Sequence, residues 1–173
     1  PGSFTGLRIA MAAAKGLALS IDRPLIGISC FDAVARRATI DAAAMNFDIL
    51  LLALASKREE IFIQGRDGQG MEIIPGRVMT PLHFDDEFGP GLESDVLLYL
   101  AGEAANGLAD TLRQAGSHSR ARLEVGPTGP PNASDIAALA HEILATAHAR
   151  SRGYETGLAP VYMRSPFARA PDQ

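Results

Sequence analysis

Three short apolar runs joined by tight polar turns constrain the fold of this chain more than any other feature of its sequence. Residues 49–55 are continuously apolar, and residues 60–64 and 71–78 are rich in side chains that favour strands. Residues 57–59 and 66–70 supply the polar, Gly and Asp positions that hairpin turns use. The pattern therefore predicts three successive antiparallel strands.

Strands and helices alternate in the rest of the chain. The later part predicts an acidic helix at 84–88, a strand at 96–101, a helix at 104–115 ended by Gly116, a strand at 122–125, and a helix from Asn132 or Ser134 to about residue 150. The earlier part predicts a helix from Ser3 or Thr5 to about Leu19, a buried strand at 25–29 and a helix at 32–37. We therefore expect an α/β fold with a mixed sheet and helices on its faces.

The predicted first helix is small or apolar on nearly every side. One stripe consists of Leu7, Met11, Ala14 and Ala18, and a second consists of Arg8, Ala12, Lys15 and Leu19. A helix of this kind is either buried within its own domain or packed closely against another subunit. The sequence leaves both interpretations open.

Composition excludes several classes of protein. The 173 residues include one cysteine and carry a formal net charge of −4, which excludes an intramolecular disulfide, a Cys-based zinc finger and the basic surface of a free-standing nucleic-acid binder. The apolar stretches end well before the roughly 18 residues that a membrane span requires, and we expect no signal peptide. These features predict a cytoplasmic protein that contacts RNA only through a partner.

Several local patterns lack a residue that their chemistry requires. Residues 2–6 lack the Gly-x-Ser-x-Gly spacing of a hydrolase. The glycine-rich residues 65–70 lie between two predicted strands, with no Lys-Ser/Thr or helix start after them, which favours a hairpin turn over a phosphate-binding loop. His141 begins a zinc-site pattern, but Ala145 stands where the second histidine belongs, so His141 and His148 are interpreted as surface histidines.

Two further features receive a structural interpretation. Three adjacent carboxylates at residues 85–87 point in different directions on a short helix and are interpreted as a solvated acidic turn. Cys30 has no histidine near it in the sequence and is interpreted as an inert thiol.

Two separated signatures resemble one family. The stretches Pro-Gly-Ser-Phe-Thr-Gly-Leu-Arg-Ile at 1–9, Ala-Lys-Gly-Leu-Ala-Leu at 14–19 and Pro-Leu-Ile-Gly-Ile-Ser at 24–29, and the ending Ala-Pro-Val-Tyr-Met-Arg at 159–164, resemble the TsaB (YeaZ) family. Its members are bacterial subunits for tRNA threonylcarbamoyladenosine biosynthesis and belong to the glycoprotease-like branch of the actin-like ATPase superfamily. Gly102, directly after a predicted strand, fits the usual glycine turn of that family.

The resemblance implies an actin-like ATPase fold, which is ribonuclease H-like. Because family members usually begin well before the motif at residue 1, it also implies an N-terminally truncated version of the fold, without the opening meander and its phosphate loop. Residues 1–38 would then be the remnant of the first actin-like subdomain. Residues 39–173 would form the second, with a C-terminal helix and tail.

The same resemblance implies that this chain is not an enzyme. The catalytic paralogue of the pathway carries His-x-x-x-His, two metal ligands one helical turn apart, after the stretch that matches 24–28. This chain has Cys30 and Val34 at those places, and a valine cannot ligate a metal. No catalytic residue, metal ligand or cofactor is therefore expected in this chain, and metal and ATP are expected in partner subunits.

By this resemblance, the chain is a non-catalytic scaffold or activator of the complex that makes N6-threonylcarbamoyladenosine at position 37 of tRNA. It would dimerise with the catalytic paralogue through a four-helix interface, bind a small P-loop ATPase subunit, reach tRNA only through the complex, and form a homodimer when alone. The predicted partner-binding residues are Phe4, Thr5, Leu7, Arg8, Met11, Ala12, Lys15 and Leu19. Two alternatives stay open: a glycoprotease-type metallopeptidase, and a homodimeric binding module of the same fold.

Overall fold

The computed structural model describes residues 3–43, 45–56, 58–114, 117–146 and 159–163. Its helices are α1 (Phe4–Ser20), α2 (Cys30–Asp41), α3 (Pro81–Phe88), α4 (Ala105–Arg113) and α5 (Ala133–Ala145), with a 3₁₀ turn at Gly89–Gly91. Its strands are β1 (Ile49–Leu54), β2 (Ile61–Asp67), β3 (Glu72–Met79), β4 (Leu97–Ala101) and β5 (Arg122–Val125).

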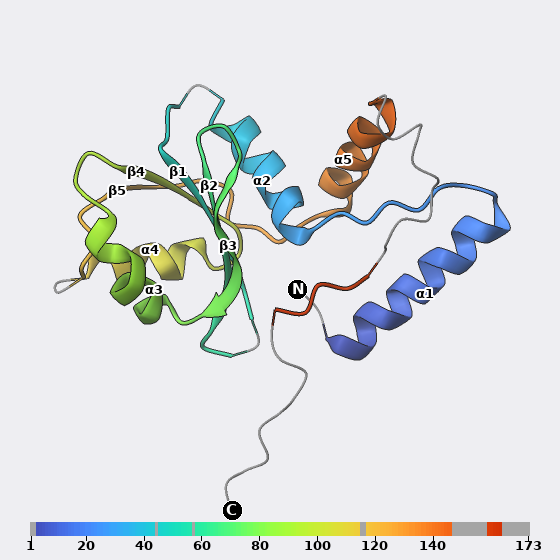
Figure 1. Ribbon diagram of the computed structural model, residues 1–173, viewed down its shortest axis with the longest axis horizontal. Helices are drawn as coiled ribbons and strands as arrows, with labels where there is room; N and C mark the ends of the chain where they lie inside the picture. The colour runs from blue at the N-terminus through green and yellow to red at the C-terminus, as the bar shows by residue number, and fades with distance from the viewer. Residues whose placement is uncertain (1–2, 44, 57, 115–116, 147–158, 164–173) are drawn as a thin grey trace, which may run out of the picture.

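The five strands form one mixed sheet in the order β3-β2-β1-β4-β5. Strands β1, β2 and β3 are joined antiparallel, whereas β4 runs parallel to β1 and β5 runs parallel to β4. Helices α3 and α4 cover one face of the sheet, α2 covers the other, and α5 packs on α2 (Figure 1). The prediction of an α/β fold with a mixed sheet and flanking helices is confirmed.

Strand β1 is buried on both faces because the sheet separates two cores. Leu51 and Ala53 belong to the core shared with α3 and α4, whereas Leu50, Leu52 and Leu54 belong to the core shared with α2. A central strand covered on both faces requires an unbroken apolar run rather than an alternating one. This requirement explains the continuous run at 49–55.

Gly102 makes the turn after β4, as the sequence predicts. Its φ is +108°, and a Cβ at this position would lie 2.3 Å from the carbonyl oxygen of Ala53. Its own N–H donates to the carbonyl of Pro127 at 2.8 Å. Only glycine fits such a close approach at a positive φ.

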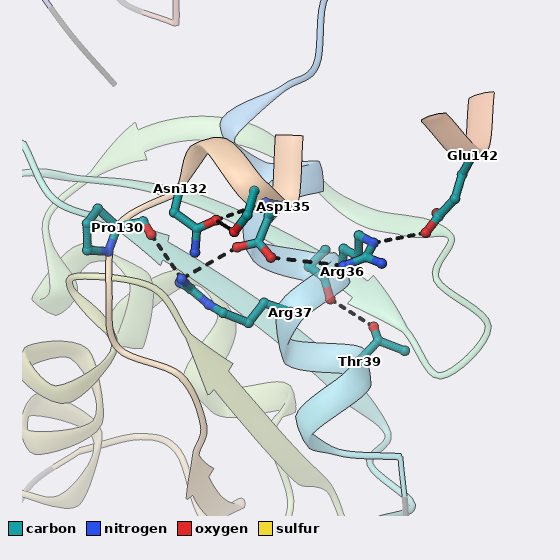
Figure 2. Close-up of polar contacts among 9 residues, drawn as sticks. Arg36, Arg37, Thr39, Pro130, Asn132, Asp135 and Glu142 are labelled. Carbon is teal, nitrogen blue, oxygen red and sulfur yellow. Dashed lines mark hydrogen bonds and ion pairs between the residues drawn. The ribbon is translucent and has the colours of Figure 1, made fainter. Parts of the chain in front are cut away.

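Helix α5 is attached to α2 by an arginine pair (Figure 2). The Arg36 Nε donates to Glu142 Oε1 at 3.0 Å, and the Arg37 Nη1 lies 3.6 Å from Asp135 Oδ2. The Arg37 Nη2 also donates to the carbonyl of Gly129 at 2.6 Å, in the linker that leads to α5. These contacts fix α5 on the outer side of α2.

The segment at 25–29 is the clearest error of the sequence prediction. It is not a strand: the segment is an unpaired connection between α1 and α2 (Figure 1), and none of the five strands in the described part of the chain pairs with it. Short apolar composition is compatible with a strand, but a strand forms only where a neighbouring strand accepts its hydrogen bonds.

Three predicted helices have different bounds in the structure. Helix α2 begins earlier than predicted, because the Ser29 Oγ accepts the N–H of Phe31 at 3.1 Å, and it continues to Asp41. Helix α3 begins at Pro81 with Thr80 as its cap. Helix α5 begins after Asn132, as predicted, but ends at Ala145. Gly116 lies outside the described residues.

Asp85 contradicts the interpretation of residues 85–87 as a solvated turn, because its side chain is buried. It accepts hydrogen bonds from the Ser117 Oγ at 2.8 Å, the His118 N–H at 2.9 Å and the Ser119 N–H at 3.1 Å. Burial alone would raise the pKa of Asp85, but these hydrogen bonds outweigh it and lower the pKa below its ordinary value. Asp85 thus anchors the segment that follows α4.

The division into residues 1–38 and 39–173 stays a prediction. Its boundary falls within α2. Phe31, Val34 and Ala38 of that helix pack against the sheet in one core.

Candidate partner-binding surface

Helix α1 is defined by its caps rather than by burial. The Ser3 Oγ accepts the N–H of Gly6 at 3.0 Å, which satisfies one of the free amides of the first turn. The helix ends at Ser20, and the N–H of Ile21 bonds back to the carbonyl of Leu17. None of its 17 residues is buried, and Figure 1 shows it lying apart from the sheet.

The structure brings the predicted partner-binding residues together on this one exposed helix. Leu7 and Met11 are half-buried, together with the other two members of their stripe, Ala14 and Ala18. The other predicted residues are exposed: Phe4, Thr5, Arg8, Ala12, Lys15 and Leu19. Leu19 is 77% exposed and Phe4 is 49% exposed, which are high values for large apolar side chains. Their role in binding a partner stays a prediction.

Three apolar side chains at this surface were not among the predicted residues. Ile9, Leu17 and Ile21 are 64%, 66% and 63% exposed. Ile9 and Leu17 lie outside both stripes of the sequence pattern. Reading every side of the helix, rather than its two apolar stripes, would have found them.

Arg8 is already engaged within the chain. Its guanidinium carbon lies 3.9 Å from the centre of the Phe4 ring, and its Nε donates to the hydroxyl of Tyr162 at 3.1 Å. Tyr162 in turn contacts Phe4, with the ring centres 5.2 Å apart. The first turns of α1 therefore form a small aromatic and cationic cluster with the tail segment 159–163.

Cys30 and Val34, which stand where the resemblance places the metal ligands of the paralogue, both lie on α2. Val34 is fully buried in the α2 core, and Cys30 is a half-buried free thiol at the start of the same helix. Within the described residues, no three His, Cys, Asp or Glu side chains gather closely enough to hold a metal ion.

The remaining sequence motifs have structural positions. His141 is exposed on α5, as predicted, and His148 lies outside the described residues. The glycine-rich run is a hairpin turn between β2 and β3, as predicted: the Asp67 Oδ1 accepts the N–H groups of Gln69 at 2.9 Å and Met71 at 2.8 Å. Among the described helices, none is both long and apolar enough to span a membrane.

The comparisons with known proteins relate this chain to one group. Residues 1–81 match the family described as TsaD, tRNA N6-adenosine threonylcarbamoyltransferase. The matched residues, just under half of the chain, include α1, α2 and the antiparallel strands β1, β2 and β3. No curated protein matches the chain.

Solved structures show the fold. A Pseudomonas aeruginosa protein described as similar to the peptidase YeaZ has 23% identity and a TM-score of 0.63, over 95% of this chain and 70% of that one. YeaZ from Pseudomonas aeruginosa has 22% identity and a TM-score of 0.55, over 84% of this chain and 63% of that one. The mixed sheet and its flanking helices thus match the YeaZ-like, actin-like fold in part.

Proposed function

We propose that this chain is a non-catalytic subunit of the cytoplasmic assembly that makes N6-threonylcarbamoyladenosine at position 37 of tRNA. The match of residues 1–81 to the TsaD family supports a link to this modification, and the likeness to YeaZ structures supports the accessory branch of the fold. The observation that carries the proposal is α1, a 17-residue helix with no buried residue and with apolar side chains on several sides.

Helix α1 has the composition of a closely packed helical interface. Covering its exposed apolar side chains would stabilise a complex by about 25 cal/mol for each Å² of apolar surface removed from water. Gly6, Ala12 and Gly16 are small enough to let a second helix approach closely, and a Cβ on Gly16 would meet no atom within 4 Å. In the proposed complex, helices of the catalytic paralogue pack on α1 to form the four-helix interface.

In this proposal the partner subunits carry out the reaction and this chain provides a binding surface. The paralogue supplies the metal and transfers the threonylcarbamoyl group, a small P-loop ATPase binds to the pair, and tRNA is reached only through the complex. This chain has Cys30 and the buried Val34 where the paralogue has its histidine ligands. Its contribution is a surface that holds and orients the catalytic subunit.

The substitution Ala12→Arg tests whether α1 is that surface. Ala12 is exposed, so arginine fits the free chain but separates helices that pack closely at this position. We expect the affinity for the same organism's paralogue to fall at least about tenfold, which corresponds to about 1.4 kcal/mol. The thermal midpoint of the isolated chain should be unchanged within about 2 °C, as for other exposed substitutions.

Ala137→Arg is the control for the added arginine. Ala137 is also an exposed alanine within a helix, but it lies on α5 and not on α1. Isothermal titration calorimetry should show strong weakening for Ala12→Arg and an affinity within about threefold of the wild type for Ala137→Arg. Equal affinities for all three proteins would place the predicted face of α1 outside the interface.

The same surface predicts self-association of the isolated chain. A homodimer formed through α1 would use the apolar side chains that the paralogue covers in the complex, so the two partners should compete. Adding the paralogue should therefore convert a homodimer into a heterodimer.

A further inference from the structure

The tail segment 159–163 contacts α1 on one side. Tyr162 lies against the Phe4 ring at 5.2 Å between ring centres, with 32° between the ring planes. Its hydroxyl oxygen accepts a hydrogen bond from the Arg8 Nε at 3.1 Å. Phe4 and Arg8 both belong to the first turns of α1, so a single tail residue contacts the N-terminal end of the helix.

The next residue, Met163, contacts the sheet on the other side. It packs against the core that α2 shares with the sheet. A Cβ built on Gly76 of β3 would lie 2.8 Å from the Met163 Cε and 3.4 Å from Phe31 of α2. The missing side chain of Gly76 therefore leaves the space that the end of Met163 occupies.

These two neighbouring contacts join α1 to the core that α2 shares with the sheet. Helix α1 has no buried residue, and residues 23–29, which lead from it to α2, form no strand. A helix attached only through such a connection would have a wide range of orientations, because nothing offsets the entropy lost in fixing one of them. The tail provides a second attachment at the opposite end of α1 (Figure 1).

We propose that Tyr162 and Met163 form a strap that holds α1 in a fixed orientation relative to the sheet. Met163 is the anchor, Gly76 provides the space for it, and Tyr162 positions Phe4 and Arg8. The strap is a property of the isolated chain. Its consequence for binding the paralogue, namely that α1 is presented in one direction, rests on the proposed function.

Hydrogen exchange of the whole chain, followed by mass spectrometry, tests the strap through three variants. Tyr162→Ala removes the contact with α1, and Tyr162→Phe keeps the ring but removes the acceptor for Arg8. Gly76→Val fills the space of Met163 and changes no residue that touches α1. Because an aromatic contact of this type changes a local equilibrium by a factor of about 2 to 10, exchange in α1 should accelerate by that factor in Tyr162→Ala and Gly76→Val. Tyr162→Phe should give a smaller change.

The pattern of exchange separates a strap from general loss of stability. Exchange in β1 and β4 should be the same in every variant, and Ile73→Val, an exposed position on the same strand as Gly76, should leave α1 unchanged. If Gly76→Val does not fold, Met163→Ala removes the anchor by shortening it and should accelerate α1 in the same way. Unchanged α1 exchange when the anchor is displaced or shortened would overturn the strap, even if Tyr162→Ala accelerates it.

Affinity for the paralogue provides the separate test of the consequence. The strap variants should bind the paralogue more weakly than the wild type, by the same factor of about 2 to 10. Accelerated exchange together with wild-type affinity would keep the strap and remove its role in partner binding. Absence of binding by the wild type itself would contradict the proposed function and leave the exchange result standing.

Discussion

Replacing Asp85 by asparagine should destabilise the fold by about 1–3 kcal/mol, because at least one main-chain N–H loses its acceptor on a buried side chain. The Asp85 carboxylate accepts from three donors, with the Ser117 Oγ and the Ser119 N–H on Oδ1 and the His118 N–H on Oδ2. An asparagine side chain has nearly the same shape but only one accepting oxygen, and its amide nitrogen donates. In either orientation of the amide, a main-chain N–H then faces a donor.

The loss should depend on pH in a defined direction. Hydrogen bonds hold the pKa of Asp85 below its ordinary value of 3.8 in the folded chain, despite the opposing effect of burial. The stabilisation by Asp85 is therefore complete above the pKa of the unfolded chain, and it is lost as the pH falls through the lower folded pKa. The difference between wild type and Asp85→Asn should be fully present at about pH 5 and should shrink below about pH 4.

Urea unfolding followed by circular dichroism measures this difference. The control is Asp86→Asn, because Asp86 is the next residue and its side chain is 66% exposed. Its substitution should change the free energy of unfolding by less than about 0.5 kcal/mol. Equal effects of the two substitutions, or an effect of Asp85→Asn that grows as the pH falls below 4, would refute the assignment of Asp85 as a buried anchor.

Three further predictions concern the glycines and the buried tyrosine. Gly102→Ala should destabilise the fold by at least about 2 kcal/mol and lower the thermal midpoint by about 4–8 °C, because its Cβ would lie 2.3 Å from the Ala53 oxygen at a φ of +108°. The control is Gly107→Ala on α4, where a Cβ would meet no atom within 4 Å. This substitution should be neutral or should stabilise the fold by up to about 1 kcal/mol. Gly126→Ala should cost about 1–3 kcal/mol in a urea titration, since its Cβ would lie 2.2 Å from the Tyr99 hydroxyl. Burial raises the pKa of Tyr99, so in an ultraviolet titration the phenolate absorbance that is lost in Tyr99→Phe should develop above the ordinary tyrosine pKa of about 10.

The sequence was most informative where apolar residues run without a break. The strands of the central sheet were predicted because residues 49–54 must be apolar to fill two cores at once. The error at 25–29 has the same origin: composition describes a segment, whereas a strand depends on a neighbour elsewhere in the chain. The acidic residues at 85–87 show a similar limit, because the donors that bury Asp85 lie more than thirty residues later.

The candidate surface was also predictable only in part. The spacing of Leu7 and Met11 identified a stripe that is half-buried in the structure. The contact between Arg8 and Tyr162 joins residues 154 positions apart, and no local pattern indicates it. Ile9 and Leu17 were missed because a pattern that seeks one apolar face of a helix does not weigh the other sides.

The most direct measurement of the central claim is size-exclusion chromatography with light scattering, on this chain mixed with the same organism's catalytic paralogue. A stable one-to-one complex should form with the wild type and with Ala137→Arg, and it should be lost with Ala12→Arg. Separate elution of the wild-type chain and the paralogue, at concentrations where each is folded, would contradict the proposed role of α1 as the surface that binds the catalytic subunit.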